Sequence, residues 1–268
     1  DDLHMPETPQ LALEFALPLL THKDSSVRVG SSNVVGACVS LMGIDARERA
    51  FRDVIFPADF SSSEIRDDAS MSTIGGISCD TAHLPQELEM THGRALALHS
   101  ILRLQPQILT ETQTTTLKEW MRSDEPLVRE AACLSVGYIL LTPNDLKEYR
   151  SPLRKCMKAT EDRAVLLAVA RSLARAAREN QDKLFLRKNG LPLLDAALML
   201  SMTTAVTPSV QKEFFVFLCW AIQKQKNGLQ DYMDLAQGEN GKFMMSLATK
   251  TLSQLAAVVE EDCEEDHH

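Results

Sequence analysis

A repeated sequence pattern constrains the fold of this chain more than any other feature. A valine-arginine pair is followed, eight residues later, by valine-glycine; this occurs at Val27-Arg28 with Val35-Gly36 and at Val128-Arg129 with Val136-Gly137. A third copy begins at Val165, thirty-seven residues after Val128. Recurrence at a fixed spacing marks a repeat architecture. We therefore expect an all-α solenoid with a period near 37 residues, in which stacked helix pairs share one core and function resides on surfaces.

Apolar residues spaced by three and four positions predict twelve helices, which group into about six antiparallel pairs. Three helices are predicted to begin at a Thr-Pro pair. The threonine side chain can accept a hydrogen bond from an unpaired amide at the start of the helix, and proline fits the first helical position. These starts are Thr8-Pro9, Thr142-Pro143 and Thr207-Pro208. The predicted helices span residues 9–21, 25–42, 45–56, 88–104, 112–121, 126–141, 144–158, 162–179, 190–203, 208–225, 229–236 and 240–259. Pro152 is expected to kink or restart the helix after Ser151.

The predicted solenoid, residues 1–259, is interrupted between Pro57 and Glu87. That stretch is rich in serine and contains Gly75-Gly76, so it is interpreted as an inserted loop. The alternative takes Ile65-Arg66 with Ile74-Gly75 as another copy of the repeat. Residues 260–268 contain six acidic residues and are expected to form a disordered acidic tail.

Composition places the chain among soluble helical proteins. Hydrophobic residues make up 44% and aromatic residues 5%, which favours helices packed through small side chains. No apolar run approaches the roughly 18 residues of a membrane helix, so neither a membrane partner nor a membrane location is expected. The six cysteines lack C-x-x-C spacing and are interpreted as reduced core thiols, typical of a cytoplasmic protein.

Enzymatic chemistry is not expected, because the sequence has no G-x-S-x-G, H-E-x-x-H, Walker-type or G-x-G-x-x-G motif. His92 and His99 lie seven residues apart on one predicted helix. Metal ligands on a helix usually stand three or four residues apart with a carboxylate or cysteine nearby, so packing or solvent-facing histidines are favoured. We therefore expect no catalytic residue, no metal, no cofactor and no small-molecule substrate.

The chain has a formal net charge of −9, yet one segment is strongly basic. Residues 147–188 contain twelve Lys or Arg and five acidic residues, a local net charge of +7. Helical spacing places seven of the cations on outward faces of two consecutive helices, and they are the candidate ribosome or RNA contacts: Lys147, Arg150, Arg154, Lys158, Arg171, Arg175 and Arg178. With few aromatic residues nearby, contact with phosphates would be electrostatic and independent of sequence. The alternative is an ordinary solvated helical face.

Two residue types within the repeat have structural interpretations. Arg28 and Arg129 begin equivalent helices, where a guanidinium can bind an acidic turn residue. Leu166 replaces this arginine in the third copy. Gly36 and Gly137 are expected to permit close helix approach.

Several stretches resemble one family of HEAT-repeat proteins. The most specific is the octapeptide Thr91-His92-Gly93-Arg94-Ala95-Leu96-Ala97-Leu98. It looks like a hallmark near the C-terminal end of the general-control translational activator family, which senses stalled ribosomes and activates an initiation-factor kinase. Other stretches are similar and stand in matching order: Asp24 to Leu41 before the octapeptide, and after it Pro126 to Leu141, Leu153 to Met157 and Ser246 to Ala256. The inserted loop departs from the family pattern, and similarity falls away between Asn180 and Pro208.

The resemblance implies a HEAT-type α-solenoid that forms the C-terminal module of a non-enzymatic, ribosome-associated scaffold. Such a module would help relay stalled-translation or starvation signals, with the kinase or its adaptor bound by other parts of the full-length protein. His92, Gly93 and Arg94 match the motif without an assigned role. The alternative is a general HEAT-repeat interaction scaffold, such as a transport receptor or phosphatase scaffold, which would bind proteins along its concave face.

Overall fold

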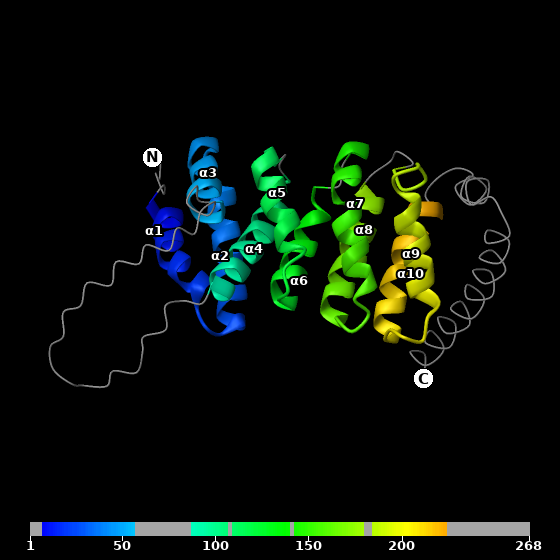
Figure 1. The fold of residues 1–268 in the computed structure, drawn as a ribbon. Coiled ribbons are helices and arrows are strands. Elements are labelled where there is room, and N and C mark those ends of the chain that lie inside the picture. Colours follow the sequence, from blue (N-terminus) through cyan, green and yellow to red (C-terminus); the bar gives the residue numbers. More distant parts are fainter. Residues whose placement is uncertain (1–6, 57–86, 107–108, 140–141, 180–183, 224–268) are drawn as a thin grey trace, which may run out of the picture. The chain divides into compact units, whose positions relative to one another are not determined.

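The computed structural model describes residues 7–56, 87–106, 109–139, 142–179 and 184–223, and this part of the chain is all-α, with helices and no strand. The chain divides into two compact units, Asp1–Ser135 and Val136–His268. Figure 1 shows the helices of both units. The predicted fold class is thus confirmed at the level of helical content.

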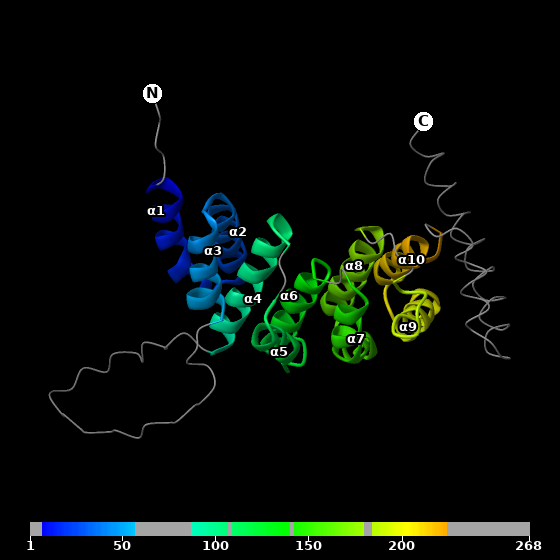
Figure 2. The same ribbon diagram turned by 90° about the horizontal axis from the view of Figure 1, so that it is seen from above.

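The first unit is built around two long helices that lie side by side, α2 (Ser25–Leu41) and α4 (Glu87–Leu104). Figure 2 shows the same pair from above. The shorter elements pack on this pair or follow it: α1 (Glu7–Ala16), the 3-10 turn η1 (Leu17–Thr21), α3 (Ile44–Ala50), the π-helical turn η2 (Phe51–Ile55), α5 (Glu111–Trp120) and α6 (Pro126–Val136).

The described residues of the second unit include two helical hairpins packed against each other. α7 (Pro143–Lys158) pairs with α8 (Arg163–Glu179), and α9 (Leu191–Met202) pairs with α10 (Pro208–Gln223). The first helices of the two hairpins, α7 and α9, contact each other, and the second helices, α8 and α10, lie side by side. An apolar stripe on α8, including Val165, Val169 and Leu173, is fully buried by this packing.

All ten predicted helices that fall within the described residues are confirmed. Seven agree to within two residues at both ends. The helix predicted at 9–21 begins at Glu7, before its predicted cap Thr8, and is α-helical only to Ala16, where η1 takes over. The helix predicted at 45–56 is α-helical only to Ala50 and continues as η2, and the one predicted to reach residue 141 ends as α6 at Val136. α6 stops at Gly137, where a Cβ would lie 2.8 Å from the Cα of Ser172. Only a glycine allows this approach without movement. The helices predicted at 229–236 and 240–259, the Ser-rich insertion and the acidic tail lie outside the described residues.

Local hydrogen bonds explain where the helices begin. Asp24 caps α2, and its Oδ1 accepts from the amide and the hydroxyl of Ser26, both at 2.8 Å. Thr110 and Thr142 each form a reciprocal capping box with the residue three positions later, Gln113 or Asp145. Such short-range caps are readable in sequence, which is why the Thr142-Pro143 start was predicted correctly.

The copies of the repeat begin at equivalent positions of three helices. The amides of Arg28, Arg129 and Leu166 donate to the carbonyl groups of Asp24, Glu125 and Asp162, at 3.2, 3.1 and 3.0 Å. Each acceptor is an acidic residue just before its helix. The later apolar positions of the repeat are buried too, with Val35, Val136 and Leu173 at most 1% exposed. The sequence repeat therefore corresponds to a repeated helix start and a repeated buried face.

Two details differ between prediction and structure. α7 runs continuously through Pro152, so the predicted restart after Ser151 is wrong. Proline removes one helical hydrogen bond, but Pro152 is buried, which offsets part of that cost. Val27, the first residue of the repeat, is only half-buried, whereas its counterpart Val128 is 1% exposed.

The predicted core thiols are largely confirmed. Cys38, Cys133 and Cys156 are buried thiols outside any disulfide, and Cys219 is a half-buried thiol. Burial raises the pKa of the Cys38 and Cys219 thiols, which keeps both in the unreactive neutral form. Within the described residues no helix is both long and apolar enough to cross a bilayer.

Candidate functional site

The motif residues His92, Gly93 and Arg94 lie at the centre of the first unit. His92 on α4 is 4% exposed, and its Nδ1 accepts a hydrogen bond of 2.9 Å from Nε of Arg28 on α2. Arg28 is itself only 3% exposed, and its Nη1 donates to the carbonyl oxygens of His22 and Lys23 at 2.6 and 3.0 Å. One buried guanidinium thus ties α4 to the turn that precedes α2.

This arrangement fixes the protonation state of His92. Burial, and then the positive charge of Arg28, lower the pKa of His92 from 6.5 to about 4. The ring is therefore neutral near pH 7, with Nδ1 unprotonated and able to accept from Arg28. Among the described residues no group of three or more His, Cys, Asp or Glu side chains could hold a metal ion.

Gly93 and Arg94 complete the motif in different ways. A Cβ at Gly93 would overlap the carbonyl oxygen of Leu20, so α4 approaches η1 there as only a glycine permits. Arg94 is half-buried, and burial lowers its pKa. The octapeptide therefore has a structural explanation: it joins α4 to η1 and α2.

Arg129, the arginine in the second copy of the repeat, forms one of the hydrogen bonds that Arg28 forms. Arg129 Nη1 donates to the carbonyl oxygen of Ser123 at 2.7 Å, six residues earlier, just as Arg28 reaches back six residues to His22. For Arg28 the predicted acidic acceptor is wrong, since its partners are two backbone carbonyls and a histidine. The carbonyl oxygens of His22 and Lys23 accept instead, because both lie in the turn before α2 within reach of the guanidinium. Gly36 is confirmed as a close-approach site, since a Cβ there would lie 2.8 Å from Ser100 Cβ.

The basic residues of α7 form an exposed stripe. Lys147, Arg154 and Lys158 are exposed, and so is the neighbouring Lys155. Arg150 differs from them, because it is half-buried and its Nη1 donates to Asn189 Oδ1 at 3.2 Å. We call the four exposed cations the α7 basic face.

The basic residues of α8 have protein partners. Arg171 Nε lies 3.3 Å from Glu213 Oε1 on α10, and the guanidinium of Arg175 lies 3.8 Å from the centre of the Tyr138 ring. Arg178 Nη2 lies 3.3 Å from Glu179 Oε1. Each of these three arginines thus has a partner within the second unit, while the side chains of Arg171 and Arg178 are still 58% and 52% exposed.

A groove in the first unit was not anticipated from the sequence. It has a volume of about 1330 Å³ and is bordered by η2, α4, α5 and the start of α6. Its apolar wall is formed by Ile55, Phe56, Leu88, Trp120 and Val128. Phe56 and Trp120 stack with centroids 5.6 Å apart and planes 7° from parallel.

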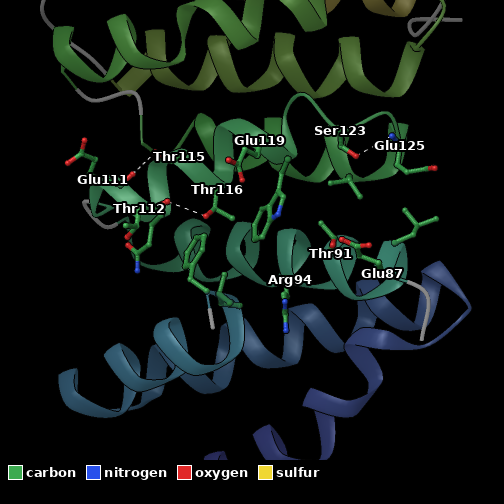
Figure 3. Close-up of a pocket in the computed structure, with 16 residues that line it drawn as sticks. Glu87, Thr91, Arg94, Glu111, Thr112, Thr115, Thr116, Glu119, Ser123 and Glu125 are labelled. Carbon is green, nitrogen blue, oxygen red and sulfur yellow. Dashed lines mark hydrogen bonds between the residues drawn. The ribbon is translucent and has the colours of Figure 1, made fainter. Parts of the chain in front are cut away.

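Carboxylates surround this groove. Glu87, Glu111, Glu119 and Glu125 line it and are exposed, while Arg94 is the one cation among the described residues of its lining. Figure 3 shows Glu111 at one end, Glu87 and Glu125 at the other and Glu119 between them, with Arg94 directed away from α5. We call this feature the acidic groove.

Comparison with family models, curated proteins and solved structures gives no significant match.

Sequence reasoning missed the acidic groove because its wall comes from segments far apart in the chain. Phe56 and Trp120, which stack, are separated by 64 positions. The one local signal was Glu119, an acidic residue in the last turn of α5, where the helix dipole disfavours a negative charge.

Proposed function

We propose that this chain is a HEAT-type α-solenoid and serves as a non-enzymatic scaffold in a ribosome-associated translational activator. The paired helices and the equivalent starts of α2, α6 and α8 support the repeat architecture. The proposed activity is to hold the activator on the ribosome in the cytoplasm. The stalled-translation signal would pass to an initiation-factor kinase through other parts of the full-length protein.

The observation that carries this proposal is the α7 basic face. Lys147, Arg154, Lys155 and Lys158 are exposed, and none of them forms an ion pair with another residue in the described part of the chain. Unpaired cations spaced along one helix suit a row of phosphates, each of which would release counterions on contact. Arg171, Arg175 and Arg178 contribute less to this proposal, because their partners are inside the unit.

Charge reversal on α7 tests the proposal. The variant K147E/R154E/K158E should weaken binding of the chain to ribosomes and to single-stranded RNA. The slope of log K against log salt should also become shallower by about 2, since each lost phosphate contact on a single strand removes about 0.7. Co-sedimentation and fluorescence anisotropy at several salt concentrations measure the two effects.

A matched control carries the same charge change elsewhere. Lys23, Arg122 and Lys212 are also exposed, so K23E/R122E/K212E alters net charge equally without touching α7. Equal losses in both triple variants would mean that only net charge matters. Unchanged binding in the α7 variant would exclude the α7 basic face as the contact.

A general protein-interaction scaffold is the second candidate, and the acidic groove favours it. The two functions differ in what the chain captures: ribosomal RNA and proteins in the first case, an RNase-insensitive protein partner in the second. Pull-down with and without RNase separates them.

A further inference from the structure

The acidic groove combines an aromatic wall with a carboxylate rim. Three wall residues are at most 8% exposed: Trp120, Ile55 and Val128. The other two, Phe56 and Leu88, are partly exposed, and they form the accessible apolar strip of the wall. The four glutamates around it are exposed, and none of them forms an ion pair with another described residue. Exposed carboxylates beside stacked aromatic rings provide both attractions that a guanidinium or ammonium group can use.

Helix stability explains some of these carboxylates but not all. Glu87 and Glu111 lie in the first turns of α4 and α5, where the helix dipole favours negative charge. Glu119 lies in the last turn of α5, where the same dipole opposes it. Its charge therefore costs the helix a small amount of stability.

The size and polar groups of the groove favour a peptide over a small molecule. A volume of about 1330 Å³ exceeds the roughly 300–1000 Å³ of ordinary ligand pockets, and carboxylates stand at both ends and in between. The hydroxyls of Thr115 and Thr116 donate to the carbonyls of Glu111 and Thr112 on their own helix. They do not present donors fixed toward a compact ligand.

Charge complementarity decides which chain fits the groove. Residues 57–86, which join two lining residues, Phe56 and Glu87, carry five acids and one arginine. The rim would repel this segment and would also repel nucleic acid. A second copy of the chain has a net charge of −9, and its α7 basic face consists of lysines and one arginine without an apolar anchor.

We propose that the acidic groove binds a basic peptide segment of another protein, with Lys or Arg residues on both sides of one apolar or aromatic anchor. The anchor packs against Phe56 and Leu88, the accessible residues of the wall, and the flanking cations pair with Glu111 and Glu119 on one side and with Glu87 and Glu125 on the other. This site is separate from the α7 basic face and goes beyond the proposed ribosomal contact. The two proposals can fail independently.

The test measures binding of labelled twelve-residue peptides to the 268-residue chain by fluorescence anisotropy. The probe carries arginines and lysines around a central tryptophan, with two comparison peptides: one with glycine in place of tryptophan and one with glutamates in place of the cations. We expect the probe to bind, the glycine peptide to bind at least about tenfold more weakly, in line with the loss of an anchor residue, and the acidic peptide not to bind. Equal binding of the probe and the glycine peptide would overturn the proposal, because it would show charge attraction without the apolar strip.

Variants of the chain locate the site. E111Q/E119Q should weaken the probe about fivefold to twentyfold, the effect of removing two exposed ion pairs. E119Q by itself should leave thermal stability unchanged or slightly higher, so a loss of binding cannot be ascribed to unfolding. Glu179 is also an exposed acid in a last helical turn, on α8 and outside the groove, so E179Q is the matched control. Unchanged affinity in E111Q/E119Q, or an equal loss in E179Q, would overturn the assignment.

Discussion

The hydrogen bond between Arg28 and His92 predicts a specific pH dependence of stability in the first unit. The folded-state pKa of His92 is about 4, whereas an unfolded histidine titrates near 6.5. Between these values the unfolded chain binds a proton that the folded chain excludes, so stability falls as pH is lowered through this window. Below about pH 4 both states are protonated and the additional loss ceases.

The magnitude follows from the same two pKa values. A difference of this size corresponds to about 3 kcal/mol, present in full above about pH 6.5 and lost by about pH 4. The loss has a structural cause. A protonated Nδ1 would present a hydrogen to the Arg28 Nε–H group at 2.9 Å, in a site only 4% exposed. Two donors and two positive charges would then face each other without water.

The assay compares the chain with H92N, whose amide oxygen can replace Nδ1 as the acceptor but cannot titrate. The chain has two tryptophans, Trp120 in the first unit and Trp220 in the second. In a W220F background, Trp120 fluorescence reports unfolding of the first unit in urea. H92N should be less stable than the parent at pH 7, and the stability difference should shrink by about 3 kcal/mol on going to pH 4. A stability difference independent of pH would refute the reasoning.

Two further predictions concern packing. Gly93→Ala should destabilise the first unit by at least about 2 kcal/mol, because the added Cβ would overlap the Leu20 carbonyl. Gly30→Ala in α2 should stabilise the same unit by about 0.5 to 1 kcal/mol, because a Cβ there would meet nothing within 4 Å. Urea unfolding compares them, and equal effects would contradict the close approach at Gly93. Val128→Asp should cost several kcal/mol, because Val128 is 1% exposed, whereas Leu127→Asp at 41% exposure should cost far less. A thermal shift of the same size in both would show that Val128 is not in a dry core.

Much of the secondary structure was predictable because it is set by local interactions. Apolar spacing, a threonine cap at Thr142 and an acidic residue before each repeated helix act within a few positions of one another. The burial of Val35 and Val136 follows from the same periodicity. The end of α6 was missed because it depends on how closely Gly137 approaches Ser172, a contact across 35 positions.

The candidate sites, in contrast, depend on contacts between residues far apart in the chain. The seven basic residues of α7 and α8 look alike in sequence, but Arg171 meets Glu213, 42 positions away, while Lys147, Arg154 and Lys158 meet solvent. Whether a cation is paired or free depends on which distant helix packs beside it, so helical periodicity alone could not separate them. The motif at His92 was found as a pattern, and its partner Arg28, 64 positions away, emerged only from the packing.

The sequence by itself determined where the helices lie and which face of each is apolar, because hydrogen bonds within a helix and its caps connect near neighbours. Tertiary structure alone decided that Arg28 and His92 share one buried hydrogen bond, that Arg171 of α8 pairs with Glu213 of α10 and that Phe56 meets Trp120 beneath a carboxylate rim. The physical reason is that desolvation and charge pairing depend on every atom within a few ångströms, and most of those atoms belong to residues far away along the chain.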